Sequence, residues 1–228
     1  METEDDDILE AWQMWIAAYG ELRELALQPV ANGWWHDVGK RQQSGRYFFC
    51  QPDLAAFQSL AEACEEPAVH FEMPVARHDL EACIPEAWTL APAQFLMAAS
   101  QLTEAHLPIP DSCDLAVNIE GRHVRVGILD GAGMPLSRGV CLVAHATAVL
   151  DQIVTEPACR RQGMGATIVA ELLHQASARG ATRGLLVATA EGRPFYEALG
   201  WTCLSEVSTA VSPVSTRAVT HLRVIARQ

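Results

Sequence analysis

The stretch Val154-Thr155-Glu156-Pro157-Ala158-Cys159-Arg160-Arg161-Gln162-Gly163-Met164-Gly165 joins a predicted strand to a predicted helix. We expect the strand over residues 148–155, which are rich in β-branched side chains and are followed by a proline. We expect the helix over residues 164–179, where apolar residues recur at helical spacing ahead of a glycine. The connection between them is a loop that contains two arginines and a glycine and leads into a second glycine.

This loop has the features of an anion-binding site. The first turn of a helix has backbone N–H groups without partners and a partial positive charge, so it stabilises an anion. Arg160 and Arg161 add two full charges, while Gly163 and Gly165 have no Cβ that would keep a ligand from the main chain. The residue types supply donors and charge but no obvious metal ligands, which predicts a bound phosphate or pyrophosphate.

Two common phosphate motifs do not fit the loop. Ile168 stands where a dinucleotide fingerprint has its third small residue, and no Gly-Lys-Ser/Thr sequence of a P-loop occurs in the chain. The pattern Arg/Gln-x-x-Gly-x-Gly/Ala does fit, at Arg160, Gly163 and Gly165. It resembles the acyl-CoA pyrophosphate loop of the GNAT acetyltransferase superfamily.

The residues that follow extend this resemblance. Residues 184–189 are a continuous apolar run, as expected of a strand buried on both faces. Strand, helix and strand then form a right-handed βαβ unit with parallel strands. Residues 191–201 resemble the family's short helix that ends in Tyr-x-x-x-Gly-Phe, with Tyr196, Gly200 and Trp201 at those positions.

The resemblance covers roughly residues 113–228 and implies an α/β fold with a mixed sheet that binds acyl-CoA. We expect residues 111–228 to form this GNAT-like N-acetyltransferase domain. The other strands that we expect in it are at 113–130, 138–145, 201–207 and 217–226, with a loop at 205–215. The two helices that the family usually has between its first and second strands find no place in residues 114–146, which hold too many β-formers and glycines.

The first 110 residues are predicted to be an additional N-terminal α/β module of unknown role. Its expected elements are helices at 7–27, 52–65 and 92–106, strands at 34–38, 45–50 and 69–73, and a linker at 107–111. Two hypotheses describe it. It is a diverged, cofactor-free GNAT-like module, or it supplies the missing acceptor-side helices.

The resemblance also implies a cosubstrate, acetyl-CoA, and the residues that hold it. The backbone of Ile153, Val154 and Thr155 would pair with the pantetheine arm like an added strand, and an N–H group there would polarise the thioester oxygen. The other implied cofactor-binding residues belong to the loop, the helix start, the next strand and the following helix: Arg160, Arg161, Gln162, Gly163, Met164, Gly165, Ala166, Thr189 and Tyr196. Thr189 replaces the family's usual asparagine, so a weaker polar contact is expected there.

Direct transfer to an amine needs an acid and a base. Tyr196 is the candidate acid, because a phenol with a pKa of ~10 stays protonated at neutral pH and can protonate the coenzyme A thiolate. The alternative is a packing aromatic. Asp151 is the first candidate base, or else a polar residue on a solvated strand face. His145 and Glu156 are further candidates, with a packed histidine and a turn residue as their alternatives.

Composition limits the remaining function classes. Seven cysteines, an odd number without C-x-x-C spacing, indicate reduced thiols and a cytoplasmic protein. The acidic N-terminus and the lack of any apolar run of ~18 residues predict neither a signal peptide nor membrane association. The scattered histidines predict no metal site. A formal net charge of -12 disfavours nucleic acid and anionic membranes and would attract cationic acceptors.

The sequence therefore predicts an enzyme that moves an acetyl group from acetyl-CoA to a primary amine of a small molecule or peptide. We expect it to act as a monomer or homodimer. The alternative from another class is a non-catalytic coenzyme A-binding or regulatory module, which would keep the phosphate loop but have no working acceptor site.

Overall fold

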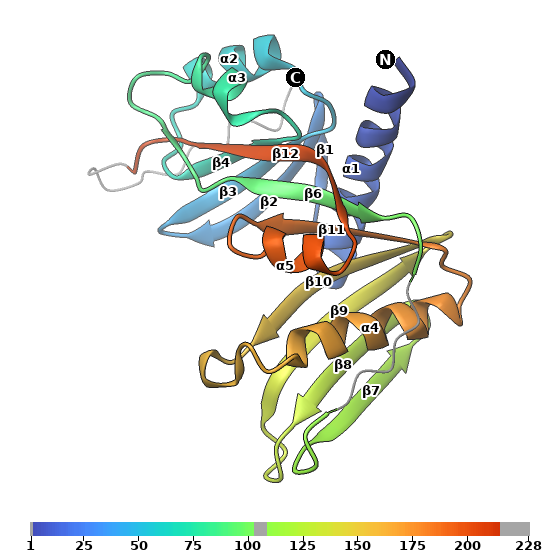
Figure 1. Cartoon of the computed structure of the whole chain (residues 1–228). Coiled ribbons are helices and arrows are strands. Elements are labelled where there is room, and N and C mark those ends of the chain that lie inside the picture. The colour runs from blue at the N-terminus through green and yellow to red at the C-terminus, as the bar shows by residue number, and fades with distance from the viewer. Residues whose placement is uncertain (1, 103–108, 215–228) are drawn as a thin grey trace.

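The computed structural model describes residues 2–102 and 109–214. They form a twelve-stranded mixed sheet in which the strand order is β1-β2-β3-β4-β12-β6-β11-β10-β9-β8-β7, and β5 pairs with β12. Helix α1 covers one face of this sheet and helices α2 to α5 lie on the other (Figure 1). None of the described helices is both long and apolar enough to cross a membrane.

The C-terminal half follows the predicted order of elements. It contains β7 (Asp114–Glu120), β8 (His123–Leu129), β9 (Pro135–Ala144), β10 (Thr147–Thr155), α4 (Met164–Ser177), β11 (Arg183–Thr189), α5 (Arg193–Ala198) and β12 (Thr202–Val211). Strands β7 to β10 form an antiparallel meander, and β10 pairs with β11 in parallel. The predicted meander and βαβ unit are thus confirmed, and no helix lies between β7 and β9.

The loop predicted at 205–215 is wrong up to Val211, because β12 continues there along β4. The strand predicted at 217–226 lies outside the described residues.

The N-terminal half contains the predicted elements over most of its length. They are α1 (Glu2–Leu22), β1 (Gln28–Val30), β2 (Gly33–Lys40), β3 (Gln43–Phe49), α2 (Leu54–Ala63), β4 (Val69–Met73), α3 (Arg77–Glu81), β5 (Thr89–Leu90) and β6 (Gln94–Ala99). Helix α1 ends five residues before the predicted Leu27, and Glu24 then has a φ of 54°. Strands β1 and β5 and helix α3 were not predicted.

The helix predicted at 92–106 is wrong over its described part, because Gln94–Ala99 is strand β6. Its alanine, glutamine, leucine and methionine residues favour a helix. The tertiary structure overrides this preference, since β6 pairs with β11 along its whole length on one side and with β12 over residues 94–98 on the other. Residues 103–108, with most of the second part of that helix and the start of the predicted linker, lie outside the described residues.

The two halves exchange strands. Strand β6 of the N-terminal half pairs with β11 of the C-terminal half, while β12 of the C-terminal half pairs with β4 of the N-terminal half. The order of elements along the chain is the same in both halves. Elements β2, β3, α2, β4 and α3 of the N-terminal half correspond to β9, β10, α4, β11 and α5 of the C-terminal half. The pairs β3–β4 and β10–β11 are both parallel. The two halves on either side of the expected boundary near residue 110 share one sheet. The repeated order agrees with the hypothesis of a diverged second module.

Helix α1 connects the halves on the opposite face from α4. Trp12 and Trp15 stack at 5.1 Å and pack against Phe48 of the N-terminal half and Val149 and Leu185 of the C-terminal half. The Trp12 indole donates a hydrogen bond to the carbonyl oxygen of Phe49 at 2.7 Å. An N-terminal helix therefore covers the sheet face behind the predicted cofactor strands, which agrees with the hypothesis that this half supplies acceptor-side structure.

Candidate functional site

Strand β10 has an irregular and open C-terminal end. Its pairing with β9 shifts register between Asp151 and Val154, and Gln152 within this bulge has a φ of 55°. Its parallel pairing with β11 is confined, in the described structure, to residues 147–149, so the two strands separate beyond that point. Backbone groups around Ile153 thus face an open gap between neighbouring strands, where an extended ligand can add hydrogen bonds.

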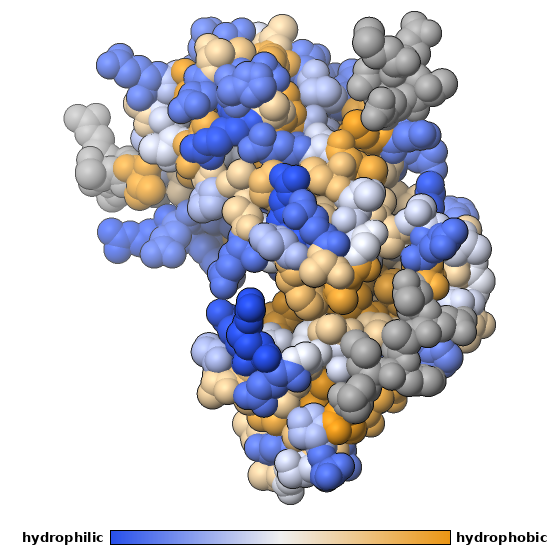
Figure 2. Space-filling model, viewed as in Figure 1, coloured by the Kyte–Doolittle hydropathy of each residue, from blue (hydrophilic) through white to orange (hydrophobic). Residues whose placement is uncertain are grey.

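The loop after β10 presents its polar side chains to solvent. Arg160 donates from Nε to the Thr155 carbonyl oxygen at 3.3 Å and lies 3.6 Å from Glu191, and the Gln162 amide donates to the Ala158 carbonyl oxygen at 3.3 Å. Arg161 is exposed and has a φ of 63°. Figure 2 shows strongly hydrophilic side chains gathered at this edge of the molecule. The loop therefore holds two arginines close to the start of α4.

The start of α4 offers free backbone donors. Gly163 is its N-cap, with a φ of 82° and no side chain to cap the helix. The first backbone hydrogen bond of the helix runs from Thr167 N–H to the Gly163 carbonyl oxygen at 3.0 Å. The N–H groups of Met164, Gly165 and Ala166 precede it and have no acceptor within the helix. Together with the exposed arginines, these N–H groups form a helix start that is suited to an anion, and the predicted phosphate contact there stays a prediction.

Gly165 lets α4 begin close to its neighbours. A Cβ at this position would lie 3.4 Å from Thr155 Oγ1 and 3.5 Å from the Phe195 ring. Thr155 is itself fixed by a hydrogen bond between its hydroxyl group and that of Ser137 at 2.8 Å. The buried Met164 side chain anchors the helix start in the core below.

Tyr196 is buried beside this gap. Its ring packs edge-on against Phe195 and Trp201, with centroid distances of 4.9 and 5.9 Å. Burial, and secondarily the negative charge of Asp151, raises the pKa of Tyr196 well above its ordinary value. The phenol therefore stays protonated.

Asp151 is held by a residue from the other half of the molecule. Arg23, just after α1, donates from Nε and Nη2 to the two carboxylate oxygens at 2.6 and 2.9 Å, and the Gln152 N–H adds a bond of 2.8 Å. The Asp151 side chain is only 14% exposed. This paired geometry orients Asp151 and leaves acceptor capacity on Oδ2, which among the described residues accepts from Arg23 Nε alone. The bond to Asp151 raises the pKa of Arg23, so the arginine remains charged.

Three further residues predicted for the site, His145, Glu156 and Thr189, have other positions or contacts in the structure. His145 lies in the β9–β10 turn, at the opposite end of the nine-residue strand β10, about 30 Å from the loop at ~3.3 Å per residue. It is therefore wrong as a candidate base for this site. Glu156 precedes the short 3-10 helix Pro157–Cys159 and donates its N–H to Leu136, so it is a turn residue. Thr189 accepts a hydrogen bond from the Gly192 N–H at 3.1 Å, which fixes the turn before α5.

Arg23 is the residue of the site that sequence reasoning missed. It is 128 residues from Asp151 along the chain and carries no local motif. In the sequence, Arg23 is visible only as a residue near the end of a predicted amphipathic helix. The N-terminal half thus contributes directly to the candidate active site, which no pattern in either half indicates alone.

The comparisons with known proteins agree with this geometry. Residues 137–211 match the family model described as acetyltransferase (GNAT) domain. The fold is similar to a GCN5-related N-acetyltransferase from Kribbella flavida, with a TM-score of 0.62 and 17% identity over 89% of this chain and 95% of that one. It is also similar to a GCN5-related N-acetyltransferase from Sphaerobacter thermophilus, with a TM-score of 0.61 and 9% identity over 86% and 80% of the two chains.

A third similar structure has two such modules in one chain. It is a tandem GNAT protein from the clavulanic acid biosynthesis pathway, with a TM-score of 0.56 and 9% identity over 76% of each chain. No curated protein matches the sequence. The chain therefore carries a GNAT acetyltransferase domain at residues 137–211, within a mixed sheet that matches GNAT folds over most of its length and has an extra N-terminal module.

Proposed function

We propose that the protein is an N-acetyltransferase that moves the acetyl group of acetyl-CoA to a primary amine by direct attack. The observation that carries the proposal is the uncapped start of α4, which lies beside the open edge of β10. The helix start fits a pyrophosphate and the open edge fits an extended pantetheine arm. Both lie within the domain that matches the acetyltransferase family.

In this proposal each part of the cosubstrate has its own contacts. Arg160, Arg161 and the N–H groups at 164–166 bind the pyrophosphate, with Gln162 at the rim of the loop. The backbone of Ile153 to Thr155 binds the pantetheine arm, and an N–H group at the bulge polarises the thioester oxygen. The acetyl group then lies near Asp151 and Tyr196.

The chemistry requires two proton transfers. The neutral amine attacks the thioester carbon, the C–N bond forms, and the C–S bond breaks with release of the thiolate. Asp151 takes the proton of the amine, directly or through water, and Tyr196 gives its proton to the thiolate. Because the charge of Asp151 helps to raise the pKa of Tyr196, protonation of Asp151 makes Tyr196 a better acid.

The ion pair between Arg23 and Asp151 favours a second candidate function. Both oxygens of the carboxylate are already bound by the guanidinium, so Arg23 competes with an amine for Asp151, and a coenzyme A-binding or regulatory module without a working base is the second candidate. Catalysis requires that the acceptor or a water molecule reach one of these oxygens.

Calorimetry and turnover distinguish these functions. We expect acetyl-CoA to bind the purified protein in the micromolar range and pantetheine, which lacks the pyrophosphate, to bind much more weakly. A panel of primary amines is then assayed by release of the coenzyme A thiol. Binding without turnover of any amine would support the regulatory module, and equal binding of pantetheine would overturn the proposed loop contacts.

A further inference from the structure

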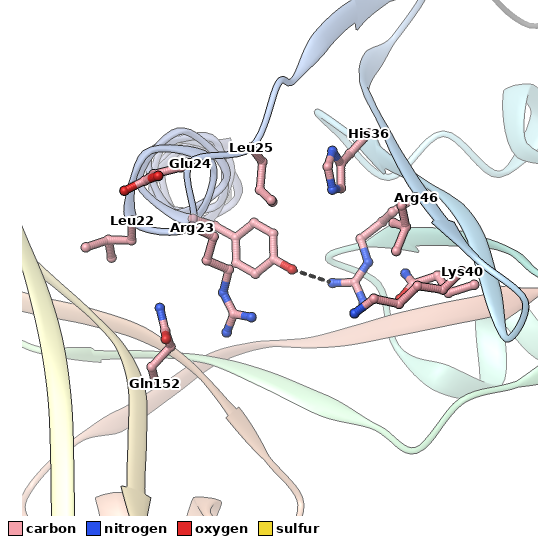
Figure 3. A pocket seen from close by; sticks show the side chains of 11 residues that line it. Leu22, Arg23, Glu24, Leu25, His36, Lys40, Arg46 and Gln152 are labelled. Carbon is pink, nitrogen blue, oxygen red and sulfur yellow. Dashed lines mark hydrogen bonds between the residues drawn. The ribbon is translucent and has the colours of Figure 1, made fainter. Parts of the chain in front are cut away.

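A cavity of about 510 Å³ lies between the two halves, on the α1 side of the sheet. It is lined by the last turn of α1 and the residues after it, by the β2–β3 hairpin, and by Gln152 in the bulge of β10. Figure 3 shows Arg23 on one side of this cavity and Lys40 and Arg46 on the other. Its volume is in the range that small-molecule sites occupy.

The lining of the cavity is cationic in a strongly acidic protein. Lys40 is the only lysine of the chain, whose net charge is -12, and it shares this cavity with Arg23 and Arg46. Glu24 is the only acidic residue of the lining. Among the residues that the structure describes, Lys40 has no ion-pair partner, so its ammonium group is available to an anion.

Arg46 is held in place by groups behind the cavity. Its Nη1 lies 3.3 Å from a carboxylate oxygen of Glu72 and 3.3 Å from the Tyr19 hydroxyl oxygen. The Gln43 amide, oriented with its oxygen toward the guanidinium, accepts from Nε at 2.9 Å and from Nη2 at 3.1 Å. Glu72 is 1% exposed and does not line the cavity. Glu72, Tyr19 and Gln43 thus position the Arg46 guanidinium, which lines the cavity.

The cavity adjoins the proposed reaction centre. Arg23, which lines it, binds Asp151, and Gln152, which also lines it, is the next residue along the bulge. An amine bound here has Arg23, which holds the candidate base Asp151, at one end of its site and Lys40 and Arg46 at the other (Figure 3). His36 adds a polar atom to the lining, since its Nδ1 is buried without a hydrogen-bond partner among the described residues.

We infer that this cavity binds the acceptor, and that the acceptor is an amine that also carries a carboxylate or phosphate group. The anionic group contacts Lys40 and Arg46, and the amine points to Asp151. This inference rests on the proposed acetyl transfer for its reaction. It departs from the expectation based on net charge, which favours cationic acceptors, because the local field of the cavity has the opposite sign.

Matched pairs of amines test the inference. The full-length protein is assayed with O-phosphoethanolamine against ethanolamine and with β-alanine against β-alaninamide. We expect kcat/KM to be at least about tenfold higher for the anionic member of the accepted pair, since a hydrogen bond to a charged group contributes about one tenfold step in affinity. The phosphate and carboxylate arms identify which anion is bound.

Two hairpin variants locate the effect. Lys40→Met should raise KM for the anionic amine about tenfold and leave kcat and acetyl-CoA binding nearly unchanged. Arg41→Met is the control, because it removes the same charge from the next residue, which does not line the cavity. Arg46→Met in a Glu72→Gln background repeats the test without leaving an unpaired carboxylate in the core.

The outcomes separate the inference from the proposed function. Equal kcat/KM for charged and neutral amines, or equal effects of Lys40→Met and Arg41→Met, would overturn the anionic acceptor and leave the acetyltransferase intact. If no amine is acetylated, binding of O-phosphoethanolamine and β-alanine is measured directly by ligand-observed NMR. Binding that Lys40→Met weakens would support the cavity as an anion site while the transfer reaction fails, and no binding would overturn the inference.

Discussion

The units β3–α2–β4 and β10–α4–β11 have the same order and the same parallel pairing, yet they start their helices differently. Four residues, 50–53, connect β3 to α2, and the Asp53 carboxylate accepts a hydrogen bond from the Ala56 N–H at 2.9 Å. Eight residues, 156–163, connect β10 to α4, whose cap is Gly163 without a side chain. The same fold thus places two helix starts beside a strand, but only the uncapped one is open to an anion.

The short helices after these units differ in a similar way. Helix α3 buries Leu80 and helix α5 buries Tyr196, each at the fourth position of its helix. Leu80 adds only apolar surface to the core, whereas Tyr196 brings a phenol near Asp151. The C-terminal unit therefore has both the proposed phosphate site and the proposed proton donor, and the N-terminal unit has no equivalent of either among the described residues.

The face toward α1 shows the opposite distribution of polar groups. On the C-terminal unit Val149 and Leu185 pack there against α1, while the N-terminal unit presents Arg46 with Glu72 beneath it. The comparison teaches that the two units carry different features. One has the helix start at which we propose that the cosubstrate binds, and the other forms most of a polar cavity.

The largest effect on activity is expected from Tyr196→Phe, which removes the hydroxyl group from α5. Helix α3 has none at the equivalent position, where Leu80 lies. We expect kcat to fall about 100- to 1,000-fold, in the range of general acid catalysis, with acetyl-CoA affinity unchanged. Because the pKa of Tyr196 is raised, the wild-type rate should show no loss from Tyr196 ionisation below about pH 10. Steady-state kinetics over a wide pH range and calorimetry measure both quantities.

Tyr47→Phe is the matched control for this variant. Tyr47 is a buried tyrosine of β3, and burial raises its pKa to about 12. Its hydroxyl group donates to the Ala31 carbonyl oxygen, away from the cofactor strands. Loss of this hydroxyl should lower stability but leave kcat unchanged. Full turnover in Tyr196→Phe would show that Tyr196 only packs against Phe195 and Trp201.

A smaller effect is expected from Gly163→Asp, which gives α4 the acidic cap residue of α2. The carboxylate repels the pyrophosphate and competes for the free N–H groups, so the Kd of acetyl-CoA should rise about 30- to 100-fold. Gly163→Asn is the control, because asparagine has the same shape without the charge and also tolerates a positive φ. Equal losses in the two variants would mean that capping of the free N–H groups or backbone strain at residue 163, and not charge at the helix start, decides binding.

The part of the fold that the sequence predicted is the part determined locally. The β10–α4–β11 unit and its loop lie within residues 147–189, and each element has a clear period or a glycine at its boundary. Strand β6 could not be predicted in the same way. Its composition favours a helix, and only the exchange with β12 and β11 makes it a strand.

The candidate site divides along the same line. The residues of the phosphate loop are consecutive, so their pattern is visible in the sequence. Arg23 and the Lys40 cavity depend on α1 crossing from one half to the other, which brings together residues more than 100 positions apart. Net charge describes the whole surface, and it gave no indication that the single lysine lies in a cavity beside two arginines.

The smallest effect tests the polar face of the N-terminal unit through Glu72→Gln. Burial raises the pKa of Glu72, although Arg46 and Arg23 oppose this, so the folded state holds its proton to higher pH than the unfolded state does. The stability that the protonated Glu72 contributes is fully present below its unfolded pKa and is lost as the pH rises through its folded pKa. The free energy of unfolding of Glu72→Gln should therefore increase, relative to the wild type, as the pH rises from the unfolded pKa of Glu72 through its raised folded pKa. Urea unfolding at several pH values measures this slope, with Glu62→Gln on the exposed side of α2 as the control for net charge. If the difference in free energy of unfolding between Glu72→Gln and the wild type does not change with pH, Arg46 keeps Glu72 ionised. The polar face of the N-terminal unit would then contain a charged pair and not a neutral carboxyl group.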